Sequence, residues 1–269
     1  MDDNERYLFD LQGFAIVPAA LTGAQLLDLN REFDSRVAAT VAPDANAHRF
    51  NAFLDWGKPF RDLIDNAPVA PILEAVLGPY FRLDHEYADL IRRGKGPIGT
   101  KLHGGAVPFD PSEYYLVRQG DIHAGLVVVA YNLRDVGPND GGFAAVQGSH
   151  KANYQFPAVW RELATDEPRP WLRRLTGPAG TAIIFSEAMT HGTLPWTGKG
   201  ERRTLFFKYG PHPMSWSAPY YDQALWPDLT DRQREILEPP NARYPSRFKE
   251  LATRRPRGVT PPPPSEENP

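Results

Sequence analysis

The sequence predicts a mainly β fold preceded by helices, and two observations lead to this prediction. Up to about residue 80, apolar side chains recur at helical spacing. From Phe81 onward, short runs rich in β-branched and aromatic residues alternate with glycine and proline turns. A double-stranded β-helix, or jelly roll, closes such strands with little exposed edge and leaves a mouth that can hold a ligand or a metal.

The helical part is expected to span about residues 1–80. Its clearest element is a helix that Thr22 caps, because apolar residues from Ala24 to Val37 follow a nearly helical period. The other elements expected here are a short helix at 7–12, a strand at 14–17, and two short helices at 60–64 and 69–77.

The β core is expected to span about residues 81–211. The strands predicted in it lie at 81–91, 101–103, 114–117, 126–133, 143–146, 181–185 and 203–209. An insertion with some helix is expected at 153–174, and a further helix at 231–237. These parts make one domain over residues 1–255. The proline-rich segment 256–269 is too polar to bury enough surface, and we expect it to be a disordered tail.

Composition excludes several classes of function. The net charge of −3 and the pI of about 6.2 do not suit a nucleic acid or an anionic membrane as the main partner. The chain has no cysteine, which excludes disulfides and thiolate sites. Its start is acidic rather than basic and apolar, and the longest apolar run, 126–131, is too short to span a bilayer. We therefore expect a cytoplasmic protein; its oligomeric state is not readable from the sequence.

Two of the seven histidines stand out by their context. His103 and His191 each end a strand-like segment and are followed at once by glycine. Two rigid strands with a small neighbouring residue can hold a metal, and a 2-His-1-carboxylate triad binds iron(II) on one face while leaving three positions open. The usual first segment of that triad is His-x-Asp. Here it is His103-Gly104-Gly105, without a carboxylate.

The sequence resembles the phytanoyl-CoA dioxygenase family of iron(II)/2-oxoglutarate oxygenases over most of residues 9–209. The resemblance is carried by the order and spacing of several segments. These are Phe14–Pro18 with the helix after Thr22, Val69–Phe81, Asn139–Phe143, Gln147–Lys151, Gly180–Phe185, His191–Thr193, Arg202-Arg203 and Tyr209. The resemblance implies a jelly-roll enzyme that uses Fe(II), 2-oxoglutarate and O2, with His103 and His191 as its two iron-binding histidines.

The resemblance also implies a site for the co-substrate. Arg202 lies eleven residues after His191, where the family places the arginine that pairs with the distal carboxylate of 2-oxoglutarate. A planar guanidinium can recognise a carboxylate through two hydrogen bonds. Arg203 is the alternative, since neighbouring strand residues face opposite ways. Thr193 and Thr100 are expected to support the same carboxylate.

Gly105 departs from the family pattern, and three explanations stay open. Chloride or bromide can occupy the missing ligand position, as in iron/2-oxoglutarate halogenases with His-x-Gly or His-x-Ala. Water can fill it. Another carboxylate can replace the missing one, and the carboxylates weighed for this role are Asp110 and Glu86, with Glu113 and Asp121 also near in sequence.

Other polar residues have weaker interpretations. His85 and Tyr87 lie on a predicted core strand and are expected to face a substrate pocket. His123, in Asp121-Ile122-His123, is expected in a surface loop, and His150 is expected to pin a turn after Gly148.

The functional prediction is an oxidoreductase that acts on an aliphatic C–H bond of a small molecule, by hydroxylation or, because of Gly105, by halogenation. The alternative is a non-catalytic jelly-roll protein that binds a small molecule and is derived from such an enzyme. Retention of Arg202 beside both histidines favours catalysis. The sequence does not identify the substrate, because enzymes of this type change substrates through their loops.

Overall fold

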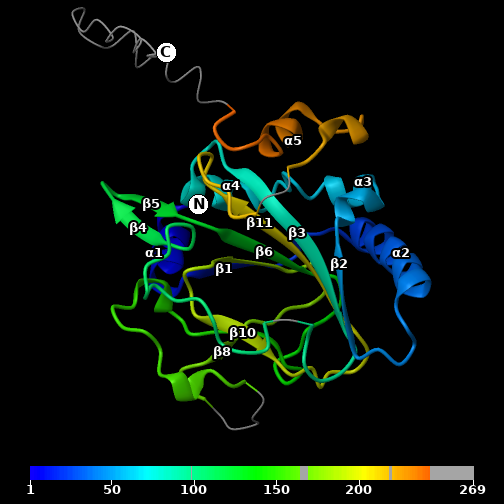
Figure 1. Ribbon diagram of the computed structural model, residues 1–269, viewed down its shortest axis with the longest axis horizontal. Coiled ribbons are helices and arrows are strands. Elements are labelled where there is room, and N and C mark those ends of the chain that lie inside the picture. Colours follow the sequence, from blue (N-terminus) through cyan, green and yellow to red (C-terminus); the bar gives the residue numbers. More distant parts are fainter. Residues whose placement is uncertain (98, 164–168, 218–219, 243–269) are drawn as a thin grey trace, which may run out of the picture.

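The computed structural model describes residues 1–97, 99–163, 169–217 and 220–242, and it is a jelly roll with helices on one side, as the sequence predicts (Figure 1). The larger sheet has six antiparallel strands in the order β1-β9-β6-β11-β3-β2. These are β1 (Phe14–Val17), β9 (Ala182–Ser186), β6 (Val127–Asn132), β11 (Arg202–Gly210), β3 (Arg82–Ile91) and β2 (Ala47–Asn51).

A smaller antiparallel sheet packs against one face of the larger one. Its strands are β10 (His191–Leu194), β7 (Gly142–Ala145) and β8 (Arg173–Arg174), with β7 in the middle. Side chains of both sheets, among them Phe143 of β7 and Phe206 of β11, share one buried cluster. A separate hairpin joins β4 (Tyr115–Arg118) to β5 (Asp121–Ala124).

Helices cover the other face of the larger sheet. They are α1 (Asp3–Gln12), α2 (Gly23–Thr40), α3 (Lys58–Arg61), α4 (Ala70–Leu77) and α5 (Asp231–Ile236). Short 3-10 segments occur at Phe53–Trp56, Ser149–Lys151, Ala158–Trp160 and Gln223–Leu225, and Trp160 of the third packs with the smaller sheet instead. Thr22 caps α2 as expected, because its hydroxyl accepts a hydrogen bond from the Gln25 amide while the Gln25 side chain accepts one from the Thr22 amide.

Strand alternation divides the core into two layers. On β6 and β11, Val127, Val129, Leu205 and Phe207 pack with the helices, whereas Val128, Ala130 and Phe206 pack toward the smaller sheet. Successive strand residues point to opposite faces, so each strand serves both layers. His103, His191 and the cavity that they line lie between the sheets.

The structure corrects four local expectations. Residues 101–103 do not form a regular strand; Lys101 and His103 make isolated bridges to Glu162 and His191. His191 begins β10 instead of ending a strand. Residues 121–123 are not a loop, because they lie in β5. Strand β2 was not foreseen, since polar residues interrupt its apolar pattern.

The histidine that was expected to pin a turn does so. His150 is buried, and its Nε2 lies 2.9 Å from the carbonyl oxygen of Asp10 in α1. None of the helices in the described ranges is long and apolar enough to cross a membrane. The tail predicted at 256–269 lies outside the described residues.

Candidate functional site

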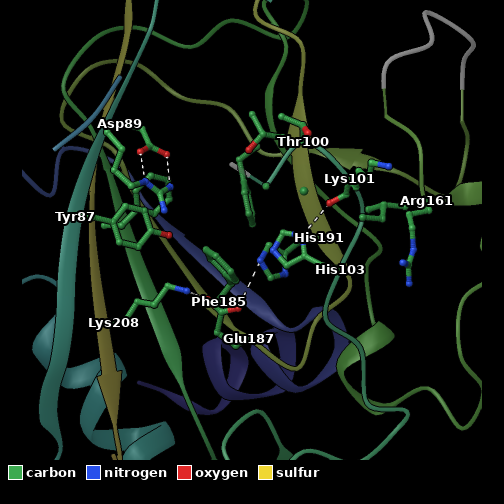
Figure 2. Close-up of a pocket in the computed structure, with 17 residues that line it drawn as sticks. Tyr87, Asp89, Thr100, Lys101, His103, Arg161, Phe185, Glu187, His191 and Lys208 are labelled. Atoms are coloured by element: carbon green, nitrogen blue, oxygen red, sulfur yellow. Dashed lines mark hydrogen bonds and ion pairs between the residues drawn. The ribbon is translucent and has the colours of Figure 1, made fainter. Parts of the chain in front are cut away.

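A cavity of about 500 Å³ opens between the two sheets (Figure 2). Tyr87 of β3 with Phe206 and Lys208 of β11 line it on the side of the larger sheet. The segment 99–103 and His191 line it on the opposite side. The cavity therefore collects residues that are far apart in the sequence, including both histidines singled out above.

His103 and His191 are neighbours because their backbones pair. The amide of each residue donates to the carbonyl oxygen of the other over 2.9 Å, and the ring centroids lie 4.2 Å apart. The Nδ1 atom of His103 lies 2.8 Å from the carbonyl oxygen of Lys101, and that of His191 lies 2.6 Å from the carbonyl oxygen of Met189. Nδ1–H must be the donor in both contacts, which leaves Nε2 of each ring as the atom that can bind a ligand.

The electrostatics of His191 suit metal binding. Burial, and after it the neighbouring His103, lowers the pKa of His191 to about 4. Its imidazole is therefore neutral near pH 7, with a lone pair on Nε2. A neutral imidazole with one nitrogen held by a backbone carbonyl is the form in which histidine binds metals.

Glu187 is a buried carboxylate in this cavity that the sequence patterns did not single out (Figure 2). Its Oε2 lies 3.6 Å from Nε2 of His191, and its Oε1 lies 2.5 Å from Nζ of Lys208. Burial by itself would raise the pKa of Glu187, but the charge of Lys208 and the two neighbouring imidazoles hold it at about 2. The same ion pair raises the pKa of Lys208, against the effect of its burial. Glu187 is thus an ionised group beside the histidines.

A signal for Glu187 is present in the sequence. The residue directly follows the apolar strand β9 and precedes His191 by four positions. A charge that interrupts a buried segment next to a candidate ligand is expensive unless it has a partner. The carboxylates expected from the sequence were instead those near His103 and on the strand of His85.

Three of the four carboxylates suggested from the sequence lie elsewhere. The fourth, Glu113, does not line the cavity, but it is close enough to Glu187 for that charge, after burial, to raise the pKa of Glu113 to about 7. Asp110 is exposed, and its Oδ1 accepts hydrogen bonds from the amide and hydroxyl of Ser112. Glu86 lies on the helix-covered face of β3, where it accepts a hydrogen bond from the Tyr221 hydroxyl. Asp121 is exposed on β5. The structure brings none of these three to the histidines.

Gly105 does not point into the main cavity. It has a φ of +116°, and a Cβ built on it would lie 3.0 Å from Oγ1 of Thr190. It lines a second, smaller cavity of about 180 Å³, together with Thr190 and Ser149. A side chain at position 105 would therefore be strained and directed toward Thr190.

Arg202 and Arg203 have opposite surroundings. Arg203 faces α2, where its guanidinium pairs with Glu201 at 2.6 Å and with Asp34 at 2.7 Å and lies over the ring of Phe33. Arg202 is buried on the other face of β11 but is not among the residues that line the cavity, and within the described ranges its Nε has no hydrogen-bond partner and its guanidinium forms no ion pair. Burial without a partner lowers the pKa of its guanidinium. A buried arginine of this kind is suited to an anionic ligand.

Thr193 and Thr100 both line the main cavity, next to the histidines. The Thr193 amide donates to the carbonyl oxygen of Gly99 over 2.7 Å, which holds the segment before His103 against β10. The hydroxyls of both threonines have no described hydrogen-bond partner and are available to a bound ligand.

His85 and Tyr87 are two residues apart on β3, so their side chains point to the same face of the sheet. Only Tyr87 lines the cavity. Tyr87 lies under the guanidinium of Arg49, whose two nitrogens hold both oxygens of Asp89 at 2.7 Å. His85 is held by Asp84 over 2.8 Å and stacks on Trp216 at a ring distance of 5.2 Å. His85 therefore belongs to the rim rather than to the cavity.

The donor set fits iron and 2-oxoglutarate in its chemistry. Two imidazoles present Nε2 to the cavity, and a buried guanidinium on the same side of the sheet has a polar Nε atom without a partner. Among the described residues, no three His, Cys, Asp or Glu side chains are already arranged as a metal site. A third protein ligand, if there is one, must move into place.

No family model and no curated protein sequence matches the chain. Solved structures do match its fold. HygX from Streptomyces hygroscopicus, with nickel and 2-oxoglutarate bound, is 24% identical, with 80% of this chain and 89% of that chain covered and a TM-score of 0.71. The same protein with nickel, 2-oxoglutarate and hygromycin B bound is 25% identical, with 80% and 89% covered and a TM-score of 0.65. SnoN, a non-heme alpha ketoglutarate dependent epimerase from nogalamycin biosynthesis, is 17% identical, with 78% and 83% covered and a TM-score of 0.55. The chain therefore has the jelly-roll fold of these proteins.

Proposed function

We propose that the protein is an Fe(II)/2-oxoglutarate-dependent oxidoreductase that uses O2 to act on an aliphatic C–H bond of a small molecule. The observation that carries this proposal is the pair of adjacent imidazoles, each with Nε2 free, on the wall of a cavity between two sheets. The unpaired, buried Arg202 supports it. So do the solved neighbours of the same fold, which hold nickel and 2-oxoglutarate, or iron.

The residues of this chain would hold the iron, the co-substrate and the substrate. His103 and His191 would hold the iron through Nε2, and their Nδ1–H groups, fixed by backbone carbonyls, would keep the rings oriented. Arg202 would pair with the distal carboxylate of 2-oxoglutarate, with hydroxyl support from Thr193 and Thr100. Bound iron and 2-oxoglutarate supply the oxidising chemistry, while the protein positions the substrate and keeps water out.

Hydroxylation is the reaction we favour, because an ionised carboxylate, that of Glu187, already lies beside His191. Halogenation is the second candidate, because Gly105 offers no carboxylate after His103 and chloride or bromide would have an open position if Glu187 stays with Lys208. The two reactions differ in what occupies one position on the iron.

The test is an anaerobic titration with Fe(II) and 2-oxoglutarate that follows the metal-to-ligand charge-transfer band, with and without chloride or bromide. The wild-type protein should develop the band. Arg202→Ala should lose it at concentrations of 2-oxoglutarate that saturate the wild type, whereas Lys199→Ala, which removes an exposed cation outside the cavity, should not. A wild-type protein without any band would favour a non-catalytic protein that binds a small molecule.

A further inference from the structure

Glu187 has one oxygen engaged and one that faces the histidines. Its Oε1 is paired with Nζ of Lys208 at 2.5 Å, whereas Oε2 forms no hydrogen bond within the described part of the chain. The distance of 3.6 Å from Oε2 to Nε2 of His191 exceeds that of a hydrogen bond. Because His191 donates through Nδ1, both Oε2 and Nε2 present lone pairs to the same space (Figure 2).

Two electron-pair donors at this separation suit a shared cation. Ligand nitrogens and oxygens lie about 2.1 Å from a first-row metal, so two ligands at a right angle are about 3 Å apart. The observed 3.6 Å is within a small side-chain movement of that value. The trio is not preassembled, because Lys208 holds the carboxylate back.

No other carboxylate in the described lining of the cavity is free to take this role. Asp89 also lines the cavity, but both of its oxygens are bound by Arg49 at 2.7 Å. Gly105 has no side chain, and a Cβ built on it would point toward Thr190. Glu187 is left as the carboxylate with an unengaged oxygen beside the imidazoles.

We infer that Glu187 is the third protein ligand of the metal, supplied from the segment between β9 and β10 in place of the residue missing at position 105. In the metal-free protein the ion pair with Lys208 holds the Glu187 carboxylate in the cavity, and the carboxylate moves to the cation when it binds. This inference rests on the proposed function and adds the identity of the third protein ligand. With Glu187 on the metal, the position that a halide would take in place of the missing carboxylate is filled.

The experiment measures Co(II) affinity by anaerobic titration, and then the Fe(II)/2-oxoglutarate band. Glu187→Gln should weaken metal binding by roughly 10- to 100-fold, which is the size of effect seen when metal-site partners are removed. Lys208→Met should bind the metal at least as tightly as the wild type, because it frees the carboxylate. Asp110→Asn, which removes an exposed carboxylate outside the cavity, serves as the matched control and should behave as the wild type.

Small anions give a second readout that does not depend on turnover. Glu187→Ala leaves a space that added acetate should fill, which restores metal affinity, whereas acetate should not rescue His191→Ala. The charge-transfer band of Glu187→Ala should respond to chloride, while the wild-type band should not.

Several outcomes would overturn the assignment while leaving the proposed function in place. They are a wild-type band that shifts with halide, a Glu187→Gln protein with unchanged metal affinity, and a Lys208→Met protein that loses affinity as Glu187→Gln does. The last result would mean that the ion pair is only structural. If the Glu187 variants fail to fold, the wild-type halide response and Lys208→Met still decide. Absence of any band in the wild type would overturn the proposed function, and this inference with it.

Discussion

His103 and His191 are joined by two backbone hydrogen bonds of 2.9 Å, although they belong to distant parts of the chain. This pairing sets their rings 4.2 Å apart and holds both at the cavity wall. The geometry of the candidate metal site therefore depends on the backbone of the smaller sheet, and side-chain substitutions can test the site without dismantling it.

His103→Ala should separate metal binding from stability. His103 is exposed, so its loss should change the free energy of unfolding by no more than about 0.5 kcal/mol. The same variant should weaken Fe(II) or Co(II) binding by at least roughly 10-fold, because one of the two proposed imidazole ligands is removed. Metal titration and urea denaturation measure the two effects. His123→Ala, at an exposed position on β5, is the control, and equal metal affinities for the two variants would contradict the assignment.

Methionine substitutions at the arginine pair should have opposite effects on the stability of the metal-free protein. Arg202→Met replaces a buried cation that has no described partner, and it should raise the free energy of unfolding by about 1 kcal/mol. Arg203→Met removes the ion pairs with Glu201 and Asp34 and should lower it by about 1–3 kcal/mol. Urea denaturation of both variants checks this. Destabilisation by Arg202→Met would mean that its guanidinium already has a structural partner.

Glu86 should make stability fall as the pH rises. Burial raises the pKa of Glu86 to about 7, despite the hydrogen bond from the Tyr221 hydroxyl, whereas the ordinary value is 4.5. The folded protein therefore binds the proton more tightly than the unfolded chain, and this contribution is complete below pH 4.5 and is lost as the pH rises to 7. Its full size is on the order of 3 kcal/mol. Glu86→Gln should match the wild type at about pH 4 and become the more stable protein by about pH 8, as measured by denaturation across this range. Parallel curves would show that Glu86 is ionised when folded.

Gly105→Ala should cost more stability than alanine at an open glycine of positive φ. Gly120, with a φ of +86°, has nothing within 4 Å of a built Cβ, so Gly120→Ala should cost about 1 kcal/mol for backbone strain alone. Gly105 has a φ of +116° and a 3.0 Å contact with Thr190, and Gly105→Ala should cost roughly 2–3 kcal/mol. Gly105→Asp should change metal affinity no more than Gly105→Ala does, since its side chain points toward Thr190. A gain in metal affinity from Gly105→Asp would contradict this direction.

Much of the fold follows from local sequence patterns. Thr22 and the apolar period after it predict α2, and the apolar runs predict β1, β6 and β9, because capping and side-chain periodicity act over a few residues. Strand β2 was not predicted, and β5 was expected to be a loop. Both are four or five residues long and partly polar, so they owe their pairing to a neighbouring strand rather than to their own pattern.

The sequence by itself determined which residue types could form the site: two histidines followed by glycine, and an arginine pair of which only one can face inward. Alternation along a strand is a local rule, so the sequence alone indicates that Arg202 and Arg203 face opposite ways. Only the tertiary structure decided what lies beside the histidines. It directs Gly105 toward Thr190 and brings Glu187 and Lys208 together next to His191, because contacts across two sheets depend on strand register and packing that no local pattern encodes.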